Sequence, residues 1–166
     1  GSILTTASNL LYSLSNLHSA EMATSSFGQG FNCTPIQAIT AFSSIINGGK
    51  LMRPYVVSQV VDNDGNIVRE NSPQVVRSVV SKETSDFVRT AIEDVFTEGT
   101  GKKAAIQGYA FGGKTGTAQQ GDRSKQKYTL SFIAYHSIED PNIICLTLIH
   151  KPANYSDVGG AATPVP

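Results

Sequence analysis

The chain contains no tryptophan and two cysteines, and its 13 basic residues are balanced by 13 acidic ones. A protein that binds nucleic acid usually carries an excess of positive charge, so the zero net charge argues against a nucleic-acid partner. The longest apolar run, residues 143–146 extended by Leu148 and Ile149, is too short to cross a bilayer. With 40% apolar and 16% charged residues, the 166 residues fit one globular domain or a large piece of one.

No cofactor or metal site is evident in the sequence. Cys33 and Cys145 lie far apart without a Cys-x-x-Cys spacing, and His18, His136 and His150 share no ligand spacing. We expect the histidines at the edge of the core or on the surface. We expect the cysteines to be two buried small side chains, with a single disulfide as the alternative in an oxidising compartment.

Two helices carry clear start and stop signals. Thr34 is a good N-cap, Pro35 suits the first helical position, and Gln37 completes a capping box. Gly48 and Gly49 stop this helix, and Ser81 can cap the second one. The second helix is predicted to bury one apolar stripe made of Phe87, Val88, Ala91, Ile92, Val95 and Phe96.

Between the two helices, the pattern predicts a hairpin. A strand over 55–61 would lead into the turn 62–65 and return over 66–69. Asp62, Asp64 and Asn66 also resemble the start of a calcium-binding loop. No glutamate stands at the twelfth position of that loop, so we interpret the segment as a hairpin turn.

The last third of the chain is predicted to form strands. Residues 111–119, 128–136 and 143–150 follow one another with short connections, which favours an antiparallel sheet covered by the two helices. Tyr128, Leu130, Phe132 and Ala134 would share one face of the middle strand. Residues 1–18 have no clear period and read as irregular. Residues 121–127 form a polar loop whose basic side chains are Arg123, Lys125 and Lys127.

The stretch 112–120 reads Gly-Gly-Lys-Thr-Gly-Thr-Ala-Gln-Gln and carries the clearest chemical signal. Acyl transfer through a serine ester requires a held substrate carboxylate, a path for protons and a stabilised oxyanion. Lys114 would supply positive charge, and the hydroxyls of Thr115 and Thr117 would donate to the carboxylate. Gly116 would let a ligand backbone approach the strand, and the backbone N–H of Thr117 would be an oxyanion donor. The tripeptide Lys114-Thr115-Gly116 alone fits an ordinary strand with a solvated lysine. The longer stretch over residues 112–119 favours an active site.

The same stretch also matches a phosphate-binding loop, written as Gly108, four residues, then Gly113-Lys114-Thr115. Such a loop follows a buried strand and opens a helix. Residues 102–107 make a poor buried strand, and Gly121 makes a poor helix start. The context therefore disfavours a nucleotide site.

Residues 113–119 resemble the third motif of class B penicillin-binding proteins, the monofunctional transpeptidases of peptidoglycan synthesis. The resemblance extends over nearly all of the chain from residue 21 onward. It includes residues 22–30, 34–37, 47–49 with Pro54, 99–104, 131–134, and 159–160 with Ala162.

The resemblance implies an α/β (α+β) fold, an antiparallel sheet flanked by helices in the penicillin-binding and serine β-lactamase-like arrangement. It implies that residues 1–166 are the C-terminal portion of one transpeptidase domain. The family's nucleophile is the serine of an upstream Ser-x-x-Lys, followed by a Ser-x-Asn motif. Here Ser-x-Asn is absent, and Ser124 to Lys127, downstream in the basic loop, reads as a chance Ser-x-x-Lys match. We therefore expect both motifs to lie before residue 1, and this chain alone to be inactive.

For the complete protein, the resemblance implies a transpeptidase that takes the D-Ala-D-Ala end of a peptidoglycan stem peptide and is acylated by β-lactams. Lys114, Thr115, Gly116 and Thr117 would be its substrate-binding strand, with Lys114 and Thr117 in catalytic roles. The turn over 25–30 would be scaffold only. No cofactor and no metal are expected.

The resemblance also places the complete protein at the extracytoplasmic face of the bacterial membrane, anchored there, with no membrane contact from this segment. Half of a domain should expose apolar surface where the other half docks, so association or swapping is expected. The alternatives are a serine β-lactamase, a β-lactam sensor, and a non-catalytic binding or scaffold module. Residues 34–37 and the glycine turn at 28–30 favour the transpeptidase.

Overall fold

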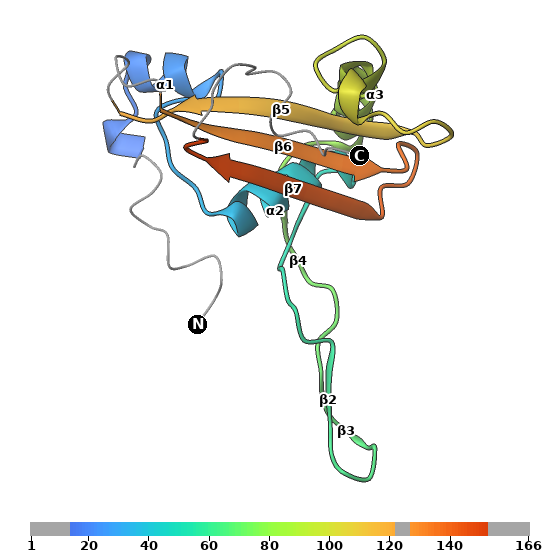
Figure 1. Ribbon diagram of the computed structural model, residues 1–166. Coiled ribbons are helices and arrows are strands. Elements are labelled where there is room, and N and C mark those ends of the chain that lie inside the picture. Colours follow the sequence, from blue (N-terminus) through green and yellow to red (C-terminus); the bar gives the residue numbers. More distant parts are fainter. Residues whose placement is uncertain (1–13, 122–126, 153–166) are drawn as a thin grey trace.

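The computed structural model describes residues 14–121 and 127–152. Its centre is a three-stranded antiparallel sheet in the order β5-β6-β7, as the sequence predicted (Figure 1). The strands are β5 (Phe111–Gln119), β6 (Tyr128–His136) and β7 (Ile143–His150). Since β6 is the middle strand, β5 and β7 each have one edge that no described strand pairs.

The middle strand β6 is buried on both faces, because the two long helices pack against opposite sides of it. Phe132 packs at a tilt against Phe96 of α3 (Lys82–Thr97), and Tyr135 lies against Phe42 of α2 (Pro35–Ile46). Side chains an odd number of positions apart point to opposite faces of a strand. The predicted face containing Leu130 and Phe132 is confirmed as part of the core with Phe96.

Tyr135 is the largest fully buried side chain of the described residues. It pairs with Gly112 across the β5–β6 ladder, and its ring lies over that glycine because Gly112 has no side chain. Its hydroxyl reaches the carbonyl of Arg89 on α3 at 3.5 Å. Burial raises the pKa of Tyr135 to about 12, against a smaller opposing effect of the Arg89 charge. The ring thus ties the sheet to α3 across the edge strand.

Both predicted helix starts are confirmed. Thr34 and Gln37 form the capping box: the Gln37 N–H donates to Thr34 Oγ1 at 3.3 Å, and the Thr34 N–H donates to Gln37 Oε1 at 2.8 Å. At α3, Ser81 Oγ accepts from the Thr84 N–H at 3.1 Å. Each cap satisfies N–H groups that the first helical turn leaves without a partner.

The predicted apolar stripe of α3 is wrong in part. Phe87 is 74% exposed and Ala91 is exposed, whereas Ser85 is completely buried. Ser85 lies beneath the glycine turn after α2, where its Oγ accepts from the Gly48 N–H at 3.0 Å. A specific hydrogen bond, and not hydrophobicity, therefore sets which face of this helix turns inward near its start.

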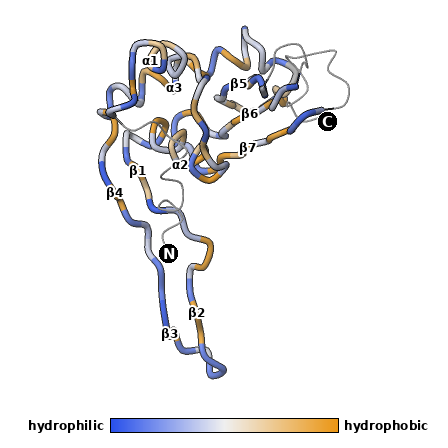
Figure 2. Tube along the Cα trace, turned by 90° about the vertical axis from the view of Figure 1, so that its left-hand side faces the viewer, coloured by the Kyte–Doolittle hydropathy of each residue, from blue (hydrophilic) through white to orange (hydrophobic). Residues whose placement is uncertain are grey.

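Residues 50–78 form an arm of two successive two-stranded ribbons that extends away from the sheet (Figures 1 and 2). The predicted strand over 55–61 is shorter in the structure, and two strands nearer the body were not predicted. The predicted turn is confirmed, because Asp62 accepts hydrogen bonds from Asp64 and Asn66. The arm's strands are β1 (Lys50–Met52), β2 (Gln59–Val61), β3 (Ile67–Glu70) and β4 (Val75–Ser78), with β1 paired to β4 and β2 to β3.

Three short helical elements were not predicted. They are two 3₁₀ turns, Leu14–Asn16 and Lys102–Ala104, and α1 (Ser19–Ser25). The first of them lies within the segment expected to be irregular, of which residues 1–13 lie outside the described part. The turn after α1 has the predicted glycine character, with positive φ at Gly28 and Gly30.

The expectation of two buried cysteines is wrong, because Cys33 and Cys145 are both exposed and free. Cys33 lies in the loop before α2, and Cys145 lies on the outer strand β7, where no described element covers it. In the described part of the chain, no helix is long and apolar enough to cross a membrane, and no group of three or more His, Cys, Asp and Glu side chains could hold a metal ion.

Candidate active site

The Lys-Thr-Gly stretch lies in the middle of β5, at the edge of the sheet that no described strand pairs. Residues 113–115 pair with residues 132–134 of β6 in a regular ladder. They therefore form the predicted strand and not the loop before a helix that a phosphate-binding site requires.

Two hydrogen bonds reveal which way the backbone of β5 faces. Lys114 Nζ donates to the carbonyl of Thr115 at 2.9 Å, and Gln29 Nε2 donates to the carbonyl of Thr117 at 3.1 Å. In an antiparallel pair, each residue directs both its N–H and its C=O either to the partner strand or away from it. The N–H of Thr117 therefore points to the same open edge as its carbonyl.

A groove of about 620 Å³ runs along this part of β5. One side is the central part of the strand, including Lys114 and Gly116, and the floor continues onto β6. The other side is the turn after α1, with Phe42 of α2 below. The residues that line it are Ser26, Phe27, Gly28, Gln29, Phe42, Lys114, Thr115, Gly116, Thr117, Ala118, Ser131 and Ile133.

All four predicted site residues line this groove, although the alternation of the strand divides their side chains between two faces. Lys114 and Gly116 lie on the face that carries Ser131 and Ile133. The Thr115 hydroxyl lies 2.9 Å from the hydroxyl of Thr100, in the segment that follows α3. A hydroxyl can donate one hydrogen bond and accept others, so this contact fixes the Thr115 side chain and leaves it further bonding capacity.

The contact of Gln29 with the motif strand was not predicted from the sequence. The turn over 25–30 was expected to be scaffold only, yet Gln29 reaches across to β5 and touches the strand that carries the motif. Its partner Thr117 is 88 positions away, and no local pattern signals a contact over that distance. Of the predicted basic loop, Arg123, Ser124 and Lys125 lie outside the described residues, and Lys127 is exposed at its end.

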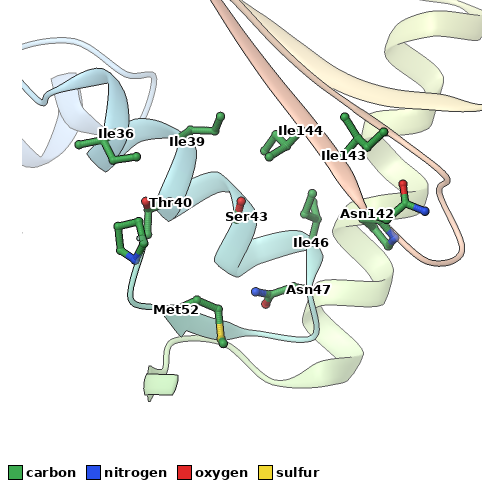
Figure 3. Close-up of a pocket in the computed structure, with 12 residues that line it drawn as sticks. Ile36, Ile39, Thr40, Ser43, Ile46, Asn47, Met52, Asn142, Ile143 and Ile144 are labelled. Carbon is green, nitrogen blue, oxygen red and sulfur yellow. The ribbon is translucent and has the colours of Figure 1, made fainter. Parts of the chain in front are cut away.

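A second cavity, of about 360 Å³, lies between α2, the start of the arm and the beginning of β7 (Figure 3). Ile39, Ile46 and Ile144 point into it, with Ser43, Asn47 and Asn142 at its rim. None of its lining side chains can ionise near neutral pH or act as an activated nucleophile. The groove beside Lys114 is therefore the candidate for chemistry.

Residues 5–165 match a family model described as the penicillin binding protein transpeptidase domain. The chain belongs to this transpeptidase family. The resemblance seen in the sequence is thus confirmed.

Curated relatives agree with the family match. The chain is 37% identical over 161 residues to stage V sporulation protein D of Bacillus subtilis, covering 94% of this chain and 25% of that protein. It is 33% identical over 152 residues to a peptidoglycan D,D-transpeptidase FtsI homolog of Mesostigma viride, covering 82% of this chain and 25% of that protein. The chain thus spans about a quarter of the length of these relatives.

Solved structures of the family superpose well. Penicillin-binding protein 3 of Mycobacterium tuberculosis, complexed with aztreonam, gives a TM-score of 0.77 at 27% identity over 87% of this chain and 35% of that one. Penicillin binding protein 2X of Streptococcus thermophilus gives a TM-score of 0.77 at 27% identity, and the match covers 92% of this chain and 24% of that one. The predicted fold class, an antiparallel sheet flanked by helices, is confirmed.

Proposed function

We propose that this chain forms one wall of the active site of a peptidoglycan D,D-transpeptidase. The observation that carries the proposal is the free edge of β5, which presents Lys114 and the backbone of Thr117 to one groove. Membership of the penicillin-binding transpeptidase family gives that edge its chemistry. The complete protein would cross-link peptidoglycan stem peptides and would bind β-lactams.

The reaction proceeds in two acyl transfers. A serine Oγ attacks the carbonyl carbon between the two terminal D-Ala residues of one stem; an ester forms, the peptide bond breaks, and D-Ala leaves with a proton on its amine. An amine of a second stem then attacks the ester, which forms the cross-link and returns the proton to the serine. We assign this serine to a part of the protein outside residues 1–166, and we assign these residues to the C-terminal portion of the domain. The chain spans about a quarter of these relatives' length, which supports a complete protein with further parts of the domain outside these residues.

Each residue of the strand has a separate role. Lys114 is exposed, and its ammonium rests on the Thr115 carbonyl, from where its long side chain can turn to a substrate carboxylate or to the serine. The Thr115 and Thr117 hydroxyls donate to the carboxylate. Gly116 keeps the strand bare for the ligand, and the outward N–H of Thr117 is one oxyanion donor. Losing one such donor costs roughly 3 kcal/mol of transition-state stabilisation.

The substrate and location follow from the same assignment. Peptidoglycan lies outside the cytoplasmic membrane, so the complete protein would act there. We further propose that it is anchored to that membrane. A solved structure of penicillin-binding protein A of M. tuberculosis, which is 25% identical to this chain, is an imipenem acyl-enzyme complex. This supports β-lactams as ligands here. The missing half of the domain would cover apolar side chains such as Phe87 and Ile143, which are 74% and 66% exposed.

Labelling with a fluorescent penicillin tests the proposal. The full-length protein should form a covalent adduct, the Lys114→Ala form of it should label far more slowly, and residues 1–166 alone should not label. Thr90→Ala, an exposed change on α3 away from the groove, is the matched control and should label normally. If the full-length protein is not labelled, the proposal of an enzyme is wrong and the protein is a non-catalytic scaffold. Covalent labelling without transpeptidation of peptide substrates would instead indicate a β-lactam sensor.

A further inference from the structure

The Gln29 side chain lies in the groove and contacts the outer edge of β5. Its Nε2 donates to the Thr117 carbonyl at 3.1 Å, and this is the one hydrogen bond that the side chain makes to the residues that the structure describes. Gly28 and Gly30 on either side have φ of 82° and 86°, a backbone conformation that side chains disfavour. The backbone conformation on both sides of Gln29 therefore favours glycine.

Two of the outward carbonyls of β5 are thus capped by side chains. Lys114 Nζ holds the carbonyl of Thr115, and Gln29 Nε2 holds that of Thr117. An exposed strand edge readily pairs with another strand, and proteins block such edges when they are not in use. A peptide that adds to the edge of β5 as a further strand needs these same carbonyls as acceptors for its N–H groups.

We propose that Gln29 is a displaceable cap on the acyl-donor groove. Its amide holds the Thr117 carbonyl while the groove is empty and releases it to a backbone N–H of the entering peptide. The inference rests on the proposed transpeptidase function. Gln29 takes part in no bond making or breaking; it is a positioning residue that sets how easily an amide-bearing ligand enters.

The cap has a consequence for selectivity. A ligand with a secondary amide N–H must displace Gln29 before it can bind to Thr117, whereas a ligand without that group has no need to. One neutral hydrogen bond at a partly exposed site shifts such an equilibrium by about two- to tenfold. Removing the cap should therefore strengthen the first binding step for one class of ligand only.

Pre-steady-state acylation of the full-length protein tests this, because it separates the dissociation constant of the first complex from the acylation rate constant. The ligands are benzylpenicillin, which carries an acylamino N–H, and imipenem, which does not. Gln29→Ala and Gln29→Leu should lower the dissociation constant for benzylpenicillin about two- to tenfold and leave its acylation rate constant unchanged. For imipenem, both the dissociation constant and the acylation rate constant should stay unchanged. The matched control is Gln59→Ala, which removes a glutamine hydrogen bond to Glu70 on the arm and should change nothing.

Three results would overturn the inference. An unchanged or higher dissociation constant for benzylpenicillin in both variants would mean that no cap is displaced. A loss of acylation with both ligands would make Gln29 a support for the strand. If neither ligand acylates the wild-type protein, both the proposed transpeptidase function and the proposed cap are wrong. The first two results contradict only the cap and leave the proposed function standing.

Discussion

Gly116 lies directly opposite Ser131 in the β5–β6 ladder, and a Cβ at position 116 would overlap the Ser131 hydroxyl. The Cβ of Ser131 would remain 3.8 Å away, an ordinary contact. The obstacle is therefore one oxygen atom on a side chain that can rotate. The absence of a side chain at this point keeps the floor of the groove open.

Gly116→Ala should destabilise the chain by about 1 kcal/mol, because the neighbouring hydroxyl must move. Ser131→Ala in the same chain should recover most of that loss, since it removes the overlapping atom. Urea unfolding of the two single variants and the double variant measures the coupling. Independent, additive effects would show that the two residues do not meet as described. Acylation of the full-length protein should stay impaired in the double variant, because the added methyl group still covers the groove floor.

Gly112→Ala should be far more damaging, at about 3 kcal/mol. The new Cβ would lie 2.6 Å from Cε1 of Tyr135, whose ring is 1% exposed and has no space to move. Thermal unfolding compared with that of Gly116→Ala measures the difference between a rigid ring and a rotatable hydroxyl. Equal unfolding temperatures for the two variants would contradict this packing.

Ser85→Ala should cost about 2 kcal/mol, because it leaves the Gly48 N–H without its acceptor beneath α3. Ser44 is the matched control: it is also buried, but its hydroxyl donates to the Ala41 carbonyl within its own helix. Ser44→Ala should therefore cost less than half as much. The denaturant midpoints of the two variants measure this difference. Similar midpoints would show that the hydrogen bond from Gly48 to Ser85 does not stabilise the contact between the turn and α3.

Stability should fall between pH 10 and pH 12 because of Tyr135. A tyrosine in the unfolded chain releases its proton near pH 10, whereas the buried Tyr135 keeps its proton up to about pH 12. The unfolded state binds fewer protons in this window, so the free energy of unfolding decreases as the pH rises. From below pH 10 to above pH 12, the free energy of unfolding should fall by about 3 kcal/mol more than in a Tyr135→Phe variant, which lacks the group. Parallel pH profiles of unfolding for the two proteins would show that burial does not raise this pKa.

The elements that could be predicted from sequence are those with local signals. The caps at Thr34 and Ser81 are side-chain contacts over three positions, and the glycines after each helix mark its end. The sheet strands were recognisable because each is eight or nine residues long. By contrast, β1 and β4 are three and four residues long and pair across the whole arm, so their formation depends on distant contacts.

The candidate site divides in the same way. The Lys114 strand could be predicted because its functional residues are consecutive in the sequence. The structure shows in addition which backbone groups of this strand face the groove. Gln29 and Ser85 were missed, since both act through single hydrogen bonds to residues 88 and 37 positions away. Burial of a polar residue such as Ser85 runs against any hydrophobic pattern, and only the packed structure reveals it.

The most direct test is to locate the acylated serine. Full-length protein would be incubated with benzylpenicillin, digested, and mapped by mass spectrometry. The account predicts one adduct, on a serine outside residues 1–166, with every peptide of this chain unmodified. An adduct within these residues, for example on Ser124, would contradict the assignment of this chain as the wall that lacks the nucleophile.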